Sequence, residues 1–354
     1  MIKINEKQQK ILLILIRGDS LRSSEIYSLI LKSAKSSYSL VTIKRELSKM
    51  VVLELLITEG AGRSRIYRIS SQGRIFTNVD AHGYCSVEPD QRYGLENFNF
   101  KLFPEFPADV FYADELKTLD RATDEYRRRT TNVSAGIRQK ELERLIIELS
   151  WKSSKIEGNT YTLLDTEKLI LENKEAVGHD KKEAIMILNH KDAFVFVQKH
   201  AENFKTLTHT NIEQLHALLV KDLGVGGGFR QSPVGVIGSK YHPLDNIYQV
   251  KEAMLSLSEV ISRIEIPYTK ALIALLGISY IQPFEDGNKR TARFMVNALL
   301  LAHGYAPLSY RSVDENEYRE GMLVFYELNS ITPFKNIFID QYEFAARNYL
   351  VNID

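Results

Sequence analysis

Apolar positions recur with a helical period over most of the chain. From position 113 onward the strongest helical segments are 138–156, 164–173, 181–203, 209–222, 247–264, 267–281, 288–303, 314–327 and 333–348. Residues 226–243 (GGGFRQSPVGVIGSKYHP) interrupt this pattern with glycine and β-branched residues, which predicts a hairpin or an extended flap. We therefore expect a mostly α-helical fold with a β-hairpin flap, preceded by a smaller α+β domain.

The first 50 residues predict three short helices. Glu6–Arg17 is apolar and stops at a glycine, and Ser23 or Ser24 can cap a second helix. Ser39 can cap the third. In that helix the buried stripe is formed at i, i+4 and i+7 by Ile43, Leu47 and Met50.

A basic surface is expected on the third helix and on the hairpin that follows it. The exposed face of the helix is polar and is made of Thr42, Lys44, Arg45 and Lys49. A recognition helix would present such a face to a major groove. Two β-prone pieces, 56–58 and 66–69, flank a tip that carries Arg63 and Arg65. Three helices and a basic hairpin resemble a winged helix-turn-helix, so we predict that this segment binds duplex DNA. Winged helices also serve as protein-binding modules.

Charge supports this division of the chain. Residues 1–70 hold 13 Lys and Arg against 6 Asp and Glu, and the remainder holds 33 against 39. A basic module joined to an acidic body suggests that the first segment meets a polyanion. We expect a winged helix at 1–72, a connector rich in proline and aromatic residues at 73–112, and a helical domain at 113–354.

Composition also bears on compartment. The longest apolar runs, such as Ile11–Ile16, are far short of the roughly 20 residues needed to span a bilayer, and the first residues do not resemble a signal peptide. The single cysteine, Cys85, cannot form an internal disulfide, which fits a reducing compartment. We expect a cytoplasmic protein that does not bind membranes.

The most informative stretch is 281–293, IQPFEDGNKRTAR. It predicts a helix, a turn with a Gly-Asn nest, and a new helix that begins near Asn288. Free N–H groups at a helix N-terminus bind anions, and Arg290 and Arg293 lie on one face where both can reach a polyphosphate. Asp286 can hold Mg²⁺, which takes one or two carboxylates plus phosphate oxygens. A nucleotide–Mg²⁺ site follows from these residue types.

This stretch resembles the Fic family signature, His-Pro-Phe-x-Asp/Glu-Gly-Asn-Gly-Arg-x-x-Arg. Fic proteins typically transfer AMP from ATP to a hydroxyl group of a target protein. The resemblance implies that Asp286 is the Mg²⁺ ligand, that Gly287 and Asn288 form the phosphate nest, and that Arg290 and Arg293 grip the phosphates.

Two further stretches resemble parts of the same family. Residues 228–243 look like the flap that docks a target segment as an added strand, which implies contacts from Arg230, Val234, Val236, Ile237 and Gly238. Residues 153–159 (SSKIEGN) are similar to the inhibitory motif, in which a helix at about 138–158 presents Ser153 and Glu157. The resemblance implies that this glutamate pairs with Arg293 and blocks the seating of the ATP γ-phosphate.

The chain departs from the signature at two positions. Gln282 stands where the family has its catalytic histidine, and a carboxamide cannot act as a general base near pH 7. Lys289 replaces the second glycine of the nest, as in the branch that resembles the phosphate-transferring Doc toxins, which leaves AMP transfer and phosphate transfer open. His242, at the end of the flap, is a weak candidate for a substitute base. Gln282 could also be an engineered residue.

Taken together, the sequence predicts a Fic-fold protein that binds ATP and Mg²⁺, has weak or no transfer activity, and regulates transcription through its basic domain. One alternative is an active adenylyltransferase or AMP-removing enzyme with another base. A second is an interaction module with a vestigial nucleotide site. The target protein and the DNA sequence are open, and a homodimer is allowed.

Overall fold

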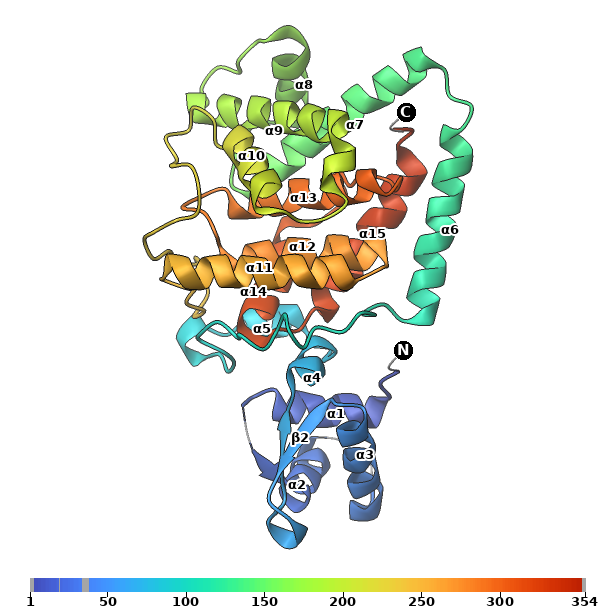
Figure 1. The fold of residues 1–354 in the computed structure, drawn as a ribbon, viewed down its shortest axis with the longest axis vertical. Helices are drawn as coiled ribbons and strands as arrows, with labels where there is room; N and C mark the ends of the chain where they lie inside the picture. The colour runs from blue at the N-terminus through green and yellow to red at the C-terminus, as the bar shows by residue number, and fades with distance from the viewer. Residues whose placement is uncertain (1–2, 19, 34–37, 352–354) are drawn as a thin grey trace. The chain divides into compact units, whose positions relative to one another are not determined.

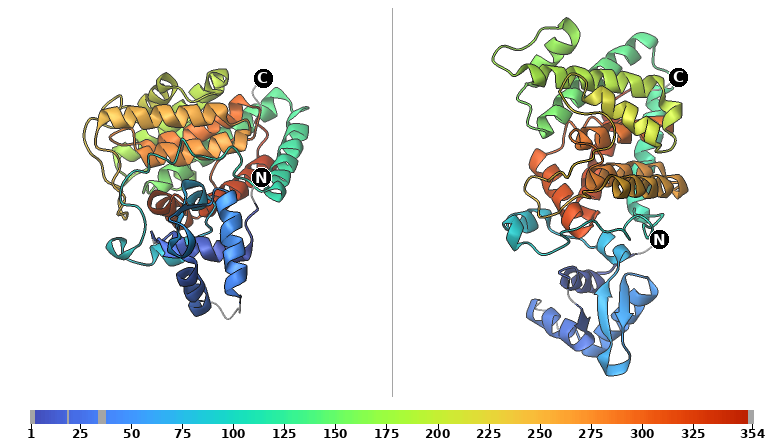
Figure 2. Two further views of the ribbon diagram at one scale, coloured as in Figure 1. Left: turned by 60° about the horizontal axis from the view of Figure 1, so that its bottom comes forward. Right: turned by 60° about the vertical axis from the view of Figure 1, so that its left-hand side comes forward.

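The computed structural model describes residues 3–18, 20–33 and 38–351. Within these ranges the chain is mostly helical, with fifteen α-helices and one small sheet, as the sequence predicts. It divides into two compact units (Figures 1 and 2). The first comprises 1–112, 235–242 and 319–336, and the second comprises 113–234, 243–318 and 337–354. In the described ranges no helix combines the length and the apolar content that crossing a bilayer requires.

The first unit begins with helices and strands in alternation. They are α1 (Glu6–Leu15), β1 (Leu21–Arg22), α2 (Ser23–Ser33), α3 (Leu40–Val52), β2 (Leu56–Glu59), β3 (Ile66–Ile69), α4 (Ser71–Ile75) and α5 (Ala81–Cys85). The three strands form an antiparallel sheet in the order β1-β3-β2, with Leu56 opposite Ile69. The two-residue strand β1 was not expected from the sequence.

The α3 helix forms as its sequence predicts. The Ser39 side chain accepts a hydrogen bond from the backbone N–H of Thr42, which caps the helix. Ile43, Leu47 and Met50 are fully buried. The predicted apolar stripe is therefore the face that holds α3 in its unit.

The second unit is built almost entirely of helices. They are α6 (Ala113–Thr130), α7 (Ala135–Ile156), α8 (Leu163–Glu172), α9 (Lys181–Lys199), α10 (His209–Leu219), α11 (Ile247–Arg263), α12 (Pro267–Ile281) and α13 (Asn288–Ala302). Two more helices, α14 (Glu315–Leu328) and α15 (Thr332–Asn348), have residues in both units. The predicted helices at 181–203 and 209–222 end earlier, at Lys199 and Leu219, and a 3₁₀ turn (Ala201–Phe204) lies between them.

Two neighbouring helices, α12 and α13, form the centre of the second unit (Figure 1). Every residue of α12 after Pro267 is buried, and so is every residue of α13 except Lys289. A helix that is apolar all round must be enclosed by others, and here α11 packs against α12 while α9 and α10 pack against α13. The loop between α12 and α13 therefore joins two rigid elements.

The flap differs from the expected β-hairpin. Residues 226–243 contain no paired strands; they run as extended chain and turns, with a single bridge between Asn97 and His242. The glycines and Pro233 interrupt the run of β-branched residues, which leaves too few consecutive residues for a ladder. The flap is therefore extended chain and turns, in which the N–H groups of residues 231, 232 and 234–237 make no backbone hydrogen bond.

Candidate nucleotide site

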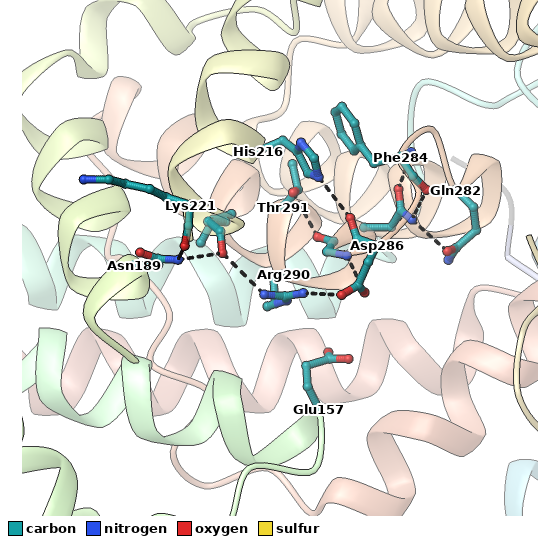
Figure 3. A network of polar contacts seen from close by, with 12 residues as sticks. Glu157, Asn189, His216, Lys221, Gln282, Phe284, Asp286, Arg290 and Thr291 are labelled. Carbon is teal, nitrogen blue, oxygen red and sulfur yellow. Dashed lines mark hydrogen bonds and ion pairs between the residues drawn. The ribbon is translucent and has the colours of Figure 1, made fainter. Parts of the chain in front are cut away.

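The loop that follows α12 starts at Gln282, which takes a left-handed conformation with φ of 52°. The Gln282 side chain is mostly buried. Its Nε2 donates to the carbonyl of Ser279 at 2.6 Å. Its Oε1 accepts from Nδ2 of Asn288 at 3.0 Å (Figure 3). Both ends of the carboxamide are thus engaged inside the loop.

Asn288, the first residue of α13, closes the loop through its side chain. Its Oδ1 accepts the backbone N–H of Phe284 at 2.8 Å, and its Nδ2 donates to the Phe284 carbonyl at 2.8 Å as well as to Gln282. The carboxamide of this predicted phosphate-nest residue holds the loop in shape, so only its backbone N–H would be available to a ligand.

Gly287 immediately precedes α13 and is the N-cap of this helix, with φ of 79°. A Cβ at this position would lie 2.8 Å from Cγ1 of Val220, so glycine is required both for its conformation and for space. The first backbone N–H groups of a helix have no acceptor within the helix, and Gly287 has no side chain to cap them. The partial positive charge at the start of α13 is what an anion site requires.

We predict that Gly287→Ala destabilises the protein by at least about 2 kcal/mol, because left-handed strain and a close contact add together. Thermal unfolding followed by circular dichroism measures the effect. Gly235→Ala is the matched control: Gly235 has no heavy atom within 4 Å of a built Cβ and does not need a positive φ. Equal melting temperatures for the two variants would contradict this account of Gly287.

Asp286 and Arg290 form an ion pair at the mouth of the loop. Oδ2 of Asp286 lies 2.8 Å from Nη2 of Arg290, and Oδ1 accepts the backbone N–H of Gly287 at 2.6 Å. The Asp286 carboxylate is two-thirds exposed, at 67%. The described residues contain no group of three or more His, Cys, Asp or Glu side chains that could hold a metal. A cation at Asp286 would therefore need ligand phosphate oxygens, and that donor set suits Mg²⁺.

Arg293, one turn further along α13, is fully buried and meets the end of α7. Its Nε donates to Oγ of Ser153 at 2.9 Å, and Nη2 donates to the Ser153 carbonyl at 3.0 Å and to Oε1 of Glu157 at 2.7 Å. The guanidinium also lies over the ring of Tyr318, with its Cζ 5.7 Å from the ring centroid. The pairing implied for Ser153, Glu157 and Arg293 is present, and it encloses the guanidinium in the protein.

The charges around Glu157 keep it ionised. Burial raises the pKa of its carboxyl, but Arg293 and Lys289 outweigh burial and the pKa is lowered overall. For Arg293, burial alone would lower the pKa of the guanidinium, and Glu157 reverses this. The contact between α7 and α13 is therefore a true ion pair.

Lys289 has ordinary helical backbone in α13. Its side chain is partly exposed, and its charge acts on Glu157. The lysine in place of the family's second glycine consequently changes the charge of the site without straining the backbone.

Two buried histidines belong to the site and were missed by the sequence analysis. His216 stacks on Phe284 with ring centroids 3.7 Å apart, and its Nε2 donates to the carbonyl of Asp286 at 2.9 Å. Nδ1 of His190 lies 3.1 Å from Oγ of Ser154 on α7, and its ring stacks on Phe294. Burial lowers the pKa of both histidines, so both are neutral near pH 7. They position the loop and the end of α7.

The flap residues fall into two groups. Arg230 is buried, and its side chain donates to the carbonyls of Gln282, Ser232 and Leu244. The expectation that Arg230 docks a target is therefore wrong, because its donors hold the base of the flap. Val234 and Val236 are half-buried, Gly238 is exposed, and Ile237 is fully exposed. His242 is exposed and lies in the first unit, with its N–H bonded to Glu96.

The basic residues of the N-terminal segment lie as the helical period predicts. Lys44, Arg45 and Lys49 are exposed on α3, and Thr42 is half-buried. Arg65 is exposed between the 3₁₀ turn Gly62–Ser64 and β3. The side chain of Arg63 lies outside the described structure.

Comparison with known proteins assigns the class. Two solved structures resemble the chain at low identity. A Fic domain-containing signaling protein from Bacteroides thetaiotaomicron matches 65% of this chain and 94% of its own, at 21% identity and a TM-score of 0.56. Fic-1 (residues 134–508) from C. elegans matches 97% of this chain and 96% of its own, at 16% identity and a TM-score of 0.60. The fold is that of Fic proteins.

Sequence comparison agrees. Residues 206–300 match the model of the Fic/DOC family. Over 226 residues the chain is 30% identical to the protein adenylyltransferase Fic of Culex quinquefasciatus, covering 62% of this chain and 44% of that protein. It is 32% identical over 202 residues to the enzyme of Drosophila erecta, covering 55% and 40%. The match thus spans less than half of these relatives. The central part of the second unit is thus similar to Fic/DOC family domains.

Proposed function

We propose that the protein binds ATP with Mg²⁺ at the loop between α12 and α13, and that it transfers AMP weakly or not at all. One observation carries the second part: the Gln282 carboxamide is engaged at both ends, by Ser279 and by Asn288. A carboxamide has no basic lone pair near pH 7, and this one is already used to hold the loop. It therefore neither accepts a proton from a target hydroxyl nor turns toward one.

The nucleotide would be bound by backbone and charge. The uncapped N–H groups of α13 would receive a phosphate, Arg290 and Arg293 would add positive charge, and Asp286 would hold Mg²⁺ against phosphate oxygens. For Asp286 to ligate a metal its ion pair with Arg290 must open, which frees that arginine for phosphate. When bound, the metal would neutralise charge on the phosphates.

Glu157 would act as a lock on this site. It occupies Nη2 of Arg293 and places a carboxylate where a terminal phosphate would need positive charge. Arg293 is fully buried, so a phosphate that displaces Glu157 must supply the negative charge that this arginine would otherwise lose. Removing the carboxylate should therefore favour nucleotide binding.

We predict that Glu157→Gly strengthens ATP–Mg²⁺ binding by about tenfold or more, since a competing charge-assisted hydrogen bond is worth roughly 1.5–3 kcal/mol. Isothermal calorimetry at pH 7 measures the change. Glu172→Gly is the matched control, because Glu172 is an exposed glutamate at the last position of α8. Arg290→Ala in the Glu157→Gly background should remove binding. If the Glu157→Gly protein fails to bind ATP, ADP or AMP at millimolar concentration, the proposed nucleotide site is wrong.

The flap would dock an extended segment of a target protein. None of the backbone N–H groups of residues 231–237 in this described segment makes a backbone hydrogen bond, and Ile237 is fully exposed. Unpaired extended backbone accepts an added strand, and alternate side chains give such docking its specificity. Val234, Val236 and Ile237 would supply the apolar contacts.

We also propose that residues 1–72 are a winged helix that binds duplex DNA, which would make the protein a DNA-linked regulator. The support is the exposed basic face of α3 (Lys44, Arg45 and Lys49) and the β2–β3 hairpin with Arg65 at its tip. A cytoplasmic location fits this role.

A further inference from the structure

The tip of the flap, residues 235–242, contains a buried ion pair from two other segments of the first unit. Arg92 belongs to the segment that follows α5, and Glu327 lies near the end of α14. Nη2 of Arg92 is 3.3 Å from Oε1 of Glu327, and both side chains are almost completely buried, at 2% and 0% exposed. Burying two charges is costly unless their remaining donors and acceptors are satisfied.

The flap tip satisfies one group of each side chain, while Nε of Arg92 is buried without a hydrogen-bond partner among the described residues. Arg92 Nη2 donates to the carbonyl of Gly238, and Oγ of Ser239 donates to Oε1 of Glu327 at 2.7 Å. The hydroxyl of Tyr84 donates to Oε2 of Glu327, also at 2.7 Å. Two consecutive flap residues are therefore bound to the two members of one ion pair, while Tyr84 completes the pair from outside the flap.

The rest of the tip is held by the same two segments. Tyr241 stacks on Tyr326 of α14 with ring centroids 5.9 Å apart, and the N–H of His242 donates to the carbonyl of Glu96 at 2.7 Å. Gly94 allows the close approach, because a Cβ there would lie 2.5 Å from the Glu327 carbonyl. The flap tip is thus fixed on both sides of the exposed turn at Ile237.

We propose that Arg92 and Glu327 are positioning residues for target docking: the pair holds Gly238 and Ser239 so that residues 234–236 are presented as preformed extended chain leading into the exposed turn at Ile237. This rests on the docking role proposed for the flap. A strand that is already extended loses little conformational entropy when a target segment pairs with it, so the clamp raises affinity for the target. The fitting partner is an extended polypeptide segment with an apolar side chain opposite Ile237.

Hydrogen exchange of the Ser239 and His242 amides, which are hydrogen-bonded in the flap tip, tests the clamp directly. Ser239→Ala removes one flap contact to Glu327 and should speed exchange of these two amides by about tenfold, since a hydrogen bond to a charged group is worth roughly 1.5 kcal/mol or more. The Tyr241 amide is left out, because the same change removes its own acceptor, the Ser239 hydroxyl. Tyr84→Phe is the matched control: it removes a hydrogen bond to the same carboxylate but none to the flap, and should change exchange less than about twofold. Arg92→Lys keeps the charge and should give an intermediate rate.

The positioning role is tested in a background that carries Gln282→His and Glu157→Gly, with a synthetic peptide of alternating valine and threonine as acceptor. Ser239→Ala should raise the KM for the peptide about tenfold and leave kcat and the Kd for ATP within twofold. Unchanged exchange in both Ser239→Ala and Arg92→Lys would overturn the clamp. Faster exchange with an unchanged KM would overturn its positioning role. If the background transfers no AMP to any acceptor, the proposed function fails, and the exchange experiment still decides the clamp.

Discussion

Gln282→His and Glu157→Gly introduced together are expected to raise AMP transfer by about 100-fold or more over either single change. The two residues limit different steps. Gln282 supplies no base to deprotonate the target hydroxyl, and Glu157 forms an ion pair with Arg293, the arginine that a phosphate of ATP would bind. A general base is usually worth about 10²–10⁴ in rate. Histidine also tolerates the left-handed backbone at position 282, where φ is 52°.

The measurement is incorporation of label from α-labelled ATP into the protein or a partner. Glu157→Gly alone should improve ATP binding and leave transfer near background, and Gln282→His alone should stay low. Gln341→His, which changes another buried glutamine, is the control for a new histidine as such. Adding Lys289→Gly to the double variant tests whether the lysine redirects the phosphates. Strong labelling by the unaltered chain would show that Gln282 is no handicap, and the proposal of a quiet site would be wrong.

Binding of duplex DNA by the chain should weaken by more than about 100-fold between 50 and 200 mM salt. Each phosphate contact releases counterions and contributes about −0.9 to the slope of log affinity against log salt. Five contacts, from Lys44, Arg45, Lys49, Arg63 and Arg65, give a slope of about −4.5. Fluorescence anisotropy with a labelled duplex measures the slope.

The slope also identifies the surface. Lys44→Ala with Arg45→Ala should reduce its magnitude by about 1.8, whereas Arg128→Ala, an exposed arginine on α6, should leave it unchanged. Salt-independent or absent binding would place this segment among the protein-binding modules instead.

Local features of the fold could be read from the sequence where a short pattern determines them. The Ser39 cap and the stripe of Ile43, Leu47 and Met50 depend on neighbours three or four positions apart, and both occur as expected. The strand β1 could not be read, because two residues have no period. The β-branched residues of the flap favoured a hairpin, but whether strands pair depends on the glycines and Pro233 that interrupt them.

The candidate site was predictable in its residue types and less so in their roles. The contact between Arg293 and Glu157 spans 136 positions and was expected only through the family resemblance. Arg230 was assigned to the wrong role, because the sequence does not show that its guanidinium is buried on carbonyls. His216 lies 70 positions from Asp286, and an isolated histidine in an amphipathic helix gives no signal of such a contact.

The backbone at the start of α13 limits how this site can diverge. Position 287 is restricted to glycine by its φ of 79° and by the close approach of Val220. A substitution there would destabilise the fold and be selected against. Position 289 is helical and its side chain is partly exposed, so no backbone requirement holds it to glycine. Exchange between glycine and lysine at position 289 during evolution is therefore not opposed by a requirement of folding. Selection at that position acts on the charge presented to the ligand.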